Sequence, residues 1–268
     1  MASRDLDSCL VCGRPSLETE LFAPVRLLRC TRCHFVFHTE LTFDQNLYGP
    51  DYWRRYDDDS ARQHEAEVRL RFVQEYVRSG RLIEIGSGTG HFVVVACRAG
   101  FESSGIEPSV EVADFRSRQS GARIVAGTVE QASLVAGSTD VVCAFHVLEH
   151  LADPVSALVR LFRTLASGGY LFLEVPNIES NRAERAGANW FHLDPQHHVG
   201  HFSPRSLREG LDRAGFEVIQ MATIPGAAYR RFPRSLLSYA KLMFVERTMH
   251  LREHPSRHEL LRAVGRRP

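Results

Sequence analysis

Four cysteines near the start of the chain have the spacing of a metal site. They form two pairs, Cys9-x2-Cys12 and Cys30-x2-Cys33. Each pair would form a tight knuckle, and two knuckles supply the four thiolates of a tetrahedral zinc site. The first residues, MASRDLDSCL, contain no apolar run typical of a secretion signal, so metal is favoured over disulfides. Two disulfides or four unengaged thiols are the alternative.

A glycine-rich turn, Glu84-Ile-Gly86-Ser-Gly88-Thr-Gly90, follows a short apolar run. Glycines let a backbone adopt positive φ and approach a ligand closely, and the next helix offers unpaired N–H groups. A dinucleotide fingerprint would need glycine at position 91, where His91 stands. The carboxylate of Glu84 suits a positively charged ligand and would repel a pyrophosphate. The turn therefore favours a sulfonium amino-acid cofactor over a dinucleotide.

A second carboxylate, Glu107, ends the apolar run that comes next along the chain. An acid at the end of the second strand of such a sheet can accept hydrogen bonds from both hydroxyls of a ribose. A surface acid is the alternative for either carboxylate taken alone. Together with the glycine turn, the two carboxylates predict a cofactor-binding site.

Histidines follow two of the later apolar runs and could remove a proton from an acceptor. An unperturbed imidazole, with a pKa of about 6.5, suits this task near neutral pH. The candidates for catalysis or acceptor contact lie in two places. His146 and His150 flank Val-Leu-Glu, and His197 and His198 lie in WFHLDPQHHVGHF. Hydrogen-bonded structural histidines are the alternative. A second metal site of His192, His197 and His201 also stays open.

The elements that must position these residues alternate between strands and helices. Strands are predicted at 81–85, 102–106, 123–126, 140–145, 170–175 and 216–221, and helices at 61–79, 89–99, 110–120, 154–165 and 203–215. This alternation predicts an α/β fold, a Rossmann-like doubly wound sheet that binds ligands at the carboxyl ends of its strands. Cys97 and Cys143 lie in apolar patterns and are expected in the core.

The predicted organisation has four parts. Residues 1–40 form the zinc ribbon and residues 41–80 an aromatic and helical lid segment. Residues 81–225 form the cofactor-binding domain, and residues 226–268 a basic, mostly helical C-terminal extension. The extension holds nine Arg and one Lys against three Glu, so it could contact an acidic carrier protein or a nucleotide-linked acceptor. A solvated helix face is the alternative.

The chain resembles class I S-adenosylmethionine-dependent methyltransferases, most of all the subgroup with an N-terminal zinc ribbon that includes natural-product and sugar-modifying enzymes. The resemblance runs from about Cys9 to Met221. The segments that carry it are the two CxxC pairs, YGPDYW, EIGSGTG, GIEPS, FHVLEHLADP, LASGGYLFLEVPN and HFSPRSLREGLDRAGFEV. It implies S-adenosylmethionine as donor, S-adenosylhomocysteine as product and a structural Zn²⁺.

The resemblance also implies cofactor-binding roles for particular residues. The turn of Gly86, Ser87, Gly88 and Gly90 would pass beneath the methionine part, with Glu84 near the amino group and Glu107 on the ribose. Thr128 and Val129 would lie near the adenine, and Phe145 and His146 near the amine. Tyr52 and Tyr56 would close over the donor. Sheets of this family usually end in an antiparallel seventh strand, which residues 227–268 do not reveal.

The predicted function is methyl transfer to oxygen or carbon of a small-molecule acceptor, in natural-product or sugar biosynthesis. The alternatives are an RNA methyltransferase that uses the ribbon as a reader, and a non-catalytic protein that binds S-adenosylmethionine. A sequence pI of about 7.8 disfavours nucleic acid. The longest apolar run, FVVVAC, is too short to span a bilayer, so we expect a cytoplasmic protein without a membrane partner. A homodimer stays open.

Overall fold

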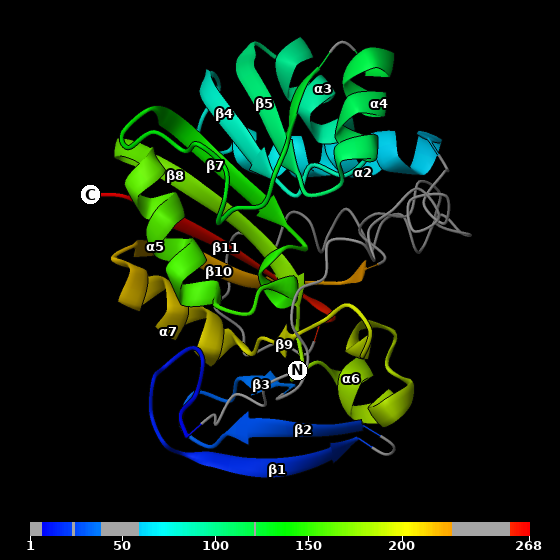
Figure 1. Cartoon of the computed structure of the whole chain (residues 1–268), viewed down its shortest axis with the longest axis vertical. Coiled ribbons are helices and arrows are strands. Elements are labelled where there is room, and N and C mark those ends of the chain that lie inside the picture. Colours follow the sequence, from blue (N-terminus) through cyan, green and yellow to red (C-terminus); the bar gives the residue numbers. More distant parts are fainter. Residues whose placement is uncertain (1–6, 23–24, 39–58, 121, 227–257) are drawn as a thin grey trace.

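The computed structural model describes residues 7–22, 25–38, 59–120, 122–226 and 258–268. Their centre is a seven-stranded sheet in the order β10-β11-β8-β7-β4-β5-β6 (Figure 1). The strands are β4 (Gly80–Ile85), β5 (Phe101–Glu107), β6 (Arg123–Ala126), β7 (Thr139–Phe145), β8 (Leu165–Pro176), β10 (Glu217–Ile224) and β11 (Leu260–Arg266). The strand order reverses beside β4, which pairs in parallel with both β5 and β7. The doubly wound sheet predicted from the sequence is confirmed.

Helices cover both faces of this sheet because its strands are apolar on both sides. On one face, α2 (Asp59–Gln74) and α3 (His91–Arg98) pack on alternate residues of β7, namely Val141, Cys143 and Phe145. On the other face, α5 (Pro154–Thr164) and α7 (Pro204–Ala214) share a core with Val142 and Ala144, the β7 residues that alternate with the first three. This period of two is the strand repeat. The remaining long helix, α4 (Val110–Ser120), lies against β6 and β5.

The helix boundaries follow the capping residues that the sequence displays. Asp153 caps α5 and accepts a hydrogen bond from the Ser156 amide at 3.0 Å. Ser203 caps α7, whose last residue is followed by Gly215 in the left-handed conformation with φ of 95°. Proline occupies the first position of both helices, where a missing N–H costs nothing.

The seventh strand corrects the prediction of a helical C-terminal extension. For Leu260–Arg266 that prediction is wrong, because β11 lies antiparallel between β8 and β10 with Leu260 opposite Pro176. All its residues except Arg266 are buried, so the segment lacks the alternation that identifies a strand. Most of the basic residues of the extension fall in residues 227–257, which lie outside the described residues.

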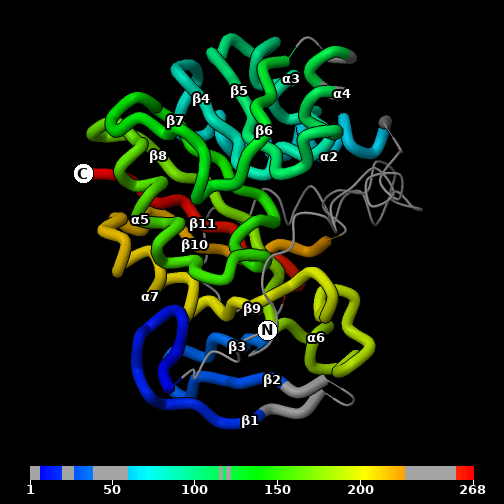
Figure 2. Tube along the Cα trace, viewed as in Figure 1, coloured from blue at the N-terminus to red at the C-terminus, as the bar shows by residue number. Residues whose placement is uncertain are grey.

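The N-terminal segment forms a second sheet that joins the body of the protein. Its strands are β1 (Leu17–Phe22), β2 (Val25–Cys30) and β3 (Val36–Phe37), and its fourth strand is β9 (Gly200–His201), from the insert that follows β8. The His38 amide continues this pairing to the Val199 carbonyl oxygen at 2.9 Å. The tube in Figure 2 shows β1–β3 beside α7 and the insert, which also contains α6 (Asn181–Ala186). The ribbon is therefore fixed to the insert, which contains the predicted acceptor residues His197 and His198.

Two further expectations are changed by the packing. Residues 59–80 are part of the main domain, because α2 buries Ala66 and Val73 against the central sheet. Cys97 is exposed on α3, so the expectation of a core position is wrong for it, whereas Cys143 is buried. Among the described residues, no helix has both the length and the apolar character needed to cross a bilayer.

Candidate active site

A cavity of about 280 Å³ lies at the carboxyl ends of β4, β5 and β7, where the strand order reverses. This is the position at which doubly wound sheets bind ligands. Its walls come from α2, the glycine turn, the ends of β5 and β7, the segment after β6, and the insert after β8. The sites predicted for a donor and for an acceptor therefore share one cavity.

The glycine turn forms the floor of this cavity through backbone that other residues rarely adopt. Gly86, Gly88 and Gly90 have φ of 66°, 48° and 72°. A Cβ on Gly86 would also lie 2.7 Å from Cγ2 of Val147. Both facts require glycine, because positive φ strains a residue with a side chain and the close approach leaves no room for one.

Glu107 lies at the end of β5 with its carboxylate already held in place. Its Oε2 accepts a hydrogen bond from the Gly88 amide at 2.8 Å, and its Oε1 accepts one from the Ser109 amide at 3.2 Å. Burial raises the pKa of this carboxyl to about 7, although both backbone hydrogen bonds oppose the shift. Glu107 lines the cavity and suits the hydroxyl pair of a ribose.

Two polar atoms beside the glycine turn are buried and lack a partner within the described part of the chain. They are Oε2 of Glu84 and Oγ of Ser87, and both residues line the cavity. Burial raises the pKa of Glu84 well above its usual range, and Glu107 adds to the shift while Arg69 opposes it. Buried polar groups normally have partners, so these atoms fit a ligand that forms hydrogen bonds with them.

The other residues predicted for the cofactor divide into those that line the cavity and those that lie outside the described residues. Thr128 and Val129, just after β6, line it, and so do Phe145 and His146 at the end of β7. The His146 amide is occupied, because it donates to the Glu174 carbonyl oxygen at 2.8 Å. His146 also has a positive φ of 57°, a strained value for a residue with a side chain. Tyr52 and Tyr56 lie outside the described residues.

The His146 side chain contacts a buried network of charged residues. The His146 ring lies 3.1 Å from Glu149 through Nδ1 and 3.3 Å from Glu174 through Nε2. Glu174, at the end of β8, also contacts Arg262 of β11 at 2.8 Å and Arg69 of α2 at 3.1 Å. Burial alone would lower the pKa of His146, but the two carboxylates raise it to about 9. At neutral pH His146 therefore carries a positive charge.

The network was not found from the sequence, although one signal was visible. Glu174 is a carboxylate inside the apolar segment LFLEVP, and a carboxylate in a buried strand needs a charged partner. Burial alone would raise the pKa of Glu174, but Arg262 and Arg69 hold it well below the usual range. Those two partners come from distant parts of the chain, so sequence spacing does not reveal them.

Of the two histidines predicted in the insert, one lines the cavity and the other does not. His198 lines the cavity with His150, and their ring centroids are 4.7 Å apart. His197 does not line it; its Nδ1 contacts Asp194 at 2.7 Å, and its carbonyl oxygen lies 3.0 Å from Nδ1 of His150. His192, which was predicted only as part of the alternative metal site, lines the cavity and stacks on His146.

The histidines on this wall are neutral for a common reason. Burial lowers the pKa of His150, lowers that of His198 further, and lowers that of His192 to about 4. Phe191 completes the wall with a side chain that is 73% exposed. Trp190 and Phe202, by contrast, are buried and pack inside the protein. The wall can therefore contact an acceptor through neutral imidazoles and one exposed aromatic ring.

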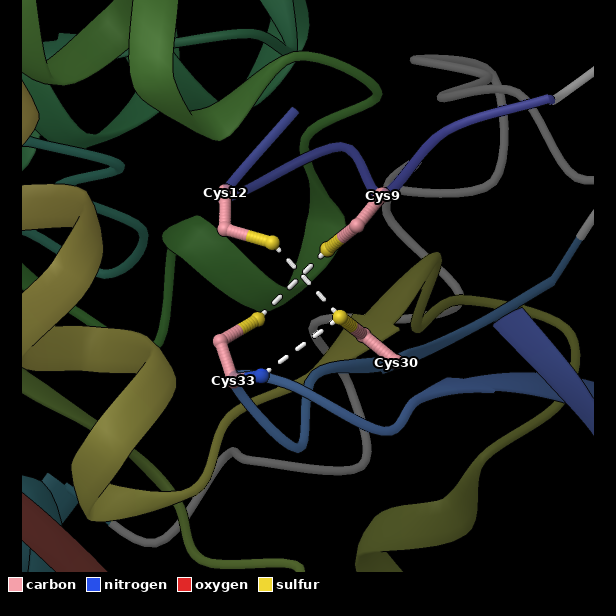
Figure 3. Close-up of side chains that lie close together, drawn as sticks. All are labelled: Cys9, Cys12, Cys30 and Cys33. Carbon is pink, nitrogen blue, oxygen red and sulfur yellow. Dashed lines mark hydrogen bonds between the residues drawn. The ribbon is translucent and has the colours of Figure 1, made fainter. Parts of the chain in front are cut away.

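The four N-terminal cysteines point toward one another, as Figure 3 shows. The Sγ atoms of Cys9 and Cys33 are 3.5 Å apart, and so are those of Cys12 and Cys30. A disulfide would need about 2.05 Å, whereas thiolates about 2.3 Å from a central zinc ion lie somewhat under 4 Å from one another. Amides of Val11 and Cys33 approach the sulfurs of Cys9 and Cys30 at 3.4 Å, which stabilises thiolates. All four sulfurs lie within 4.8 Å of one another, which fits a metal ion.

Comparisons with known proteins agree with this geometry. A family model described as a methyltransferase domain matches residues 53–221. A ubiquinone biosynthesis O-methyltransferase of Xanthomonas axonopodis is 30% identical over 176 residues, which is 60% of this chain and 72% of that protein. One of the same description from Bordetella avium is 29% identical over 41% of this chain, and the chain spans about half of it, 49%.

Solved structures share the fold. A Thermotoga maritima protein described as an S-adenosylmethionine-dependent methyltransferase, possibly acting on histamine, has a TM-score of 0.59 at 22% identity, covering 81% of this chain and 95% of that one. The [4+2]-cyclase SpnF has a TM-score of 0.53 at 20% identity, covering 75% and 80%. The second description shows that this fold also serves other chemistry. Because the family model spans more than half of the chain, including the glycine turn, Glu107 and the histidines after β7, the chain belongs to the methyltransferase domain family.

Proposed function

We propose that this chain transfers a methyl group from S-adenosylmethionine to an oxygen or carbon atom of a small-molecule acceptor. The observation that supports this proposal is the shared cavity, which joins the glycine turn and Glu107 to a wall of neutral histidines. Glu107 would accept the ribose hydroxyls, and Thr128 and Val129 would contact the adenine. Oε2 of Glu84 and Oγ of Ser87 would gain the hydrogen bonds that they lack.

The protein would contribute position and proton transfer to this reaction. When bound, the sulfonium supplies a methyl group that is activated toward nucleophiles. The histidine wall and Phe191 would hold the acceptor atom in line with the sulfur–methyl bond. Such positioning accounts for a large part of the rate acceleration in reactions of this kind. A neutral imidazole in this wall can also accept a proton from the acceptor. An oxygen acceptor is the first candidate, because the curated relatives above are named O-methyltransferases.

We also propose that Zn²⁺ occupies the four-cysteine cluster and stabilises the ribbon. The donor set of four buried sulfurs fits a structural zinc site, which has no open position. The chain would use zinc here to hold β2 and β3 in place, and β3 pairs with β9 of the insert. Zinc would therefore also shape the wall that faces the acceptor, beyond stabilising the ribbon.

Calorimetry with S-adenosylmethionine, S-adenosylhomocysteine and NAD tests the donor proposal, with zinc measured on the same sample. We expect micromolar binding of the two adenosyl ligands, none of NAD, and at least one zinc per chain. A screen of hydroxyl and carbonyl compounds, read out as S-adenosylhomocysteine formed, then tests the acceptor class. If neither adenosyl ligand binds, the methyl-transfer proposal is lost; binding without turnover would favour the non-catalytic alternative. A carrier- or nucleotide-linked acceptor stays a prediction, because residues 227–257 lie outside the described residues.

A further inference from the structure

Two side chains that line the cavity and a third that is buried beside them lie close enough together to share a metal ion. They are Glu149 and His150 of the 3₁₀ helix η2 (Leu148–His150), and His198 of the insert. One ligand atom from each lies within 4.8 Å of the other two. This cluster is separate from the four cysteines and differs from the His192, His197 and His201 set that the sequence left open.

Glu149 has a buried carboxyl oxygen that could bind a cation or accept a hydrogen bond. Its side chain is 1% exposed, and its Oε1 lies 3.1 Å from Nδ1 of His146. Its Oε2 has no hydrogen-bond partner within the described ranges. Leaving such an oxygen without a partner costs more than a typical hydrogen bond contributes.

The two histidines are oriented as metal-binding histidines usually are. Nδ1 of His150 lies 3.0 Å from the His197 carbonyl oxygen, and Nδ1 of His198 lies 2.7 Å from the His192 carbonyl oxygen. A carbonyl can only accept, so each ring carries its proton on Nδ1 and its lone pair on Nε2. A metal-ligating histidine typically has its second nitrogen fixed in this way.

We propose that Glu149, His150 and His198 bind a divalent transition metal ion such as zinc, cobalt or manganese. Two neutral imidazoles and one carboxylate are ligands that these metals accept, whereas calcium and magnesium prefer oxygen ligands. The carboxylate offsets part of the metal charge. The protonated His146 contacts the other oxygen of Glu149 and is itself balanced by Glu174.

The place of the site gives it a role at the acceptor end of the cavity. His150 and His198 both line that cavity, so a metal held by three protein ligands would keep an open position for the acceptor. Such an ion would bind an acceptor oxygen and lower the pKa of its hydroxyl, whose proton would pass to water. This role rests on the proposed methyl transfer, whereas metal binding itself does not.

Cobalt titration of the full chain, with zinc already in the cysteine cluster, tests the site. We expect calorimetry to give one further ion per chain, with a visible spectrum that lacks the intense sulfur-to-cobalt absorption of a thiolate site. Glu149→Gln and His198→Gln should each weaken cobalt binding at least about tenfold. His192→Gln is the matched control, because it changes a histidine of the same wall and keeps the carbonyl that holds His198. Its cobalt affinity should match the wild type.

Two outcomes would overturn the proposal. One is the absence of any cobalt binding beyond the cysteine cluster, and the other is wild-type cobalt affinity in Glu149→Gln. Melting curves and S-adenosylhomocysteine affinity, measured on each variant, show whether a loss of cobalt binding comes from unfolding. If the wild type binds cobalt at this site but no adenosyl ligand, the methyl-transfer proposal fails and the metal site stands.

Discussion

Donor binding should depend on pH through Glu107. Its pKa of about 7 in the free protein arises because burial disfavours the carboxylate. Ribose hydroxyls donate to an ionised carboxylate, so the ligand binds the deprotonated form. Since the free pKa is raised, affinity is full well above pH 7 and is lost as the pH falls through 7.

The size of this effect follows from the ionised fraction. Between pH 8 and pH 6 the ionised share of a group with a pKa of 7 falls about tenfold, so the dissociation constant of S-adenosylhomocysteine should rise about tenfold, or about 1.4 kcal/mol. At pH 7 binding should release about half a proton, because half of the free protein is protonated.

Calorimetry in buffers of different ionisation enthalpy measures both quantities. Glu107→Gln is the matched control: it cannot titrate, so its affinity should be weaker at pH 8 and should not follow this pH dependence. The reasoning is refuted if the wild-type dissociation constant is flat between pH 6 and pH 8. It is also refuted if Glu107→Gln retains the full slope, because the titrating group would then lie elsewhere.

Three further predictions follow from the geometry. Gly86→Ala should abolish adenosyl-ligand binding in calorimetry, because its methyl group would lie 2.7 Å from a valine side chain on backbone with positive φ. Cys12→Ser should lose zinc and lower the melting temperature by on the order of 10 °C, whereas exposed Cys97→Ser should melt like the wild type. Arg262→Met should destabilise the fold in urea unfolding by less than the about 3–5 kcal/mol of a fully unpaired buried charge, because Glu174 keeps Arg69 and His146 as partners. Adding Glu174→Gln should recover part of that loss.

The sequence alone determined the features that depend on neighbouring residues. Glycines at 86, 88 and 90 specify a backbone that few other residues adopt, and the structure has positive φ at all three. The strand–helix alternation gave the doubly wound sheet, because the periods of two and 3.6 are local properties. Asp153 and Ser203 cap the helices that follow them, and each cap closes within three residues of the chain. The cysteine spacing predicted the two knuckles, since each closes within a few residues, whereas the zinc ion stays a prediction.

Tertiary structure decided the features that join distant segments. The antiparallel strand β11 is buried on both faces and therefore has no readable period. The pairing of β3 with β9 depends on how the ribbon docks, and Cys97 is exposed because its side of α3 faces away from the sheet. Glu174 meets Arg69 and Arg262 only in the folded chain, as Glu149 and His150 meet His198. Spacing along a chain fixes local geometry, but burial and charge pairing across it require the packed fold.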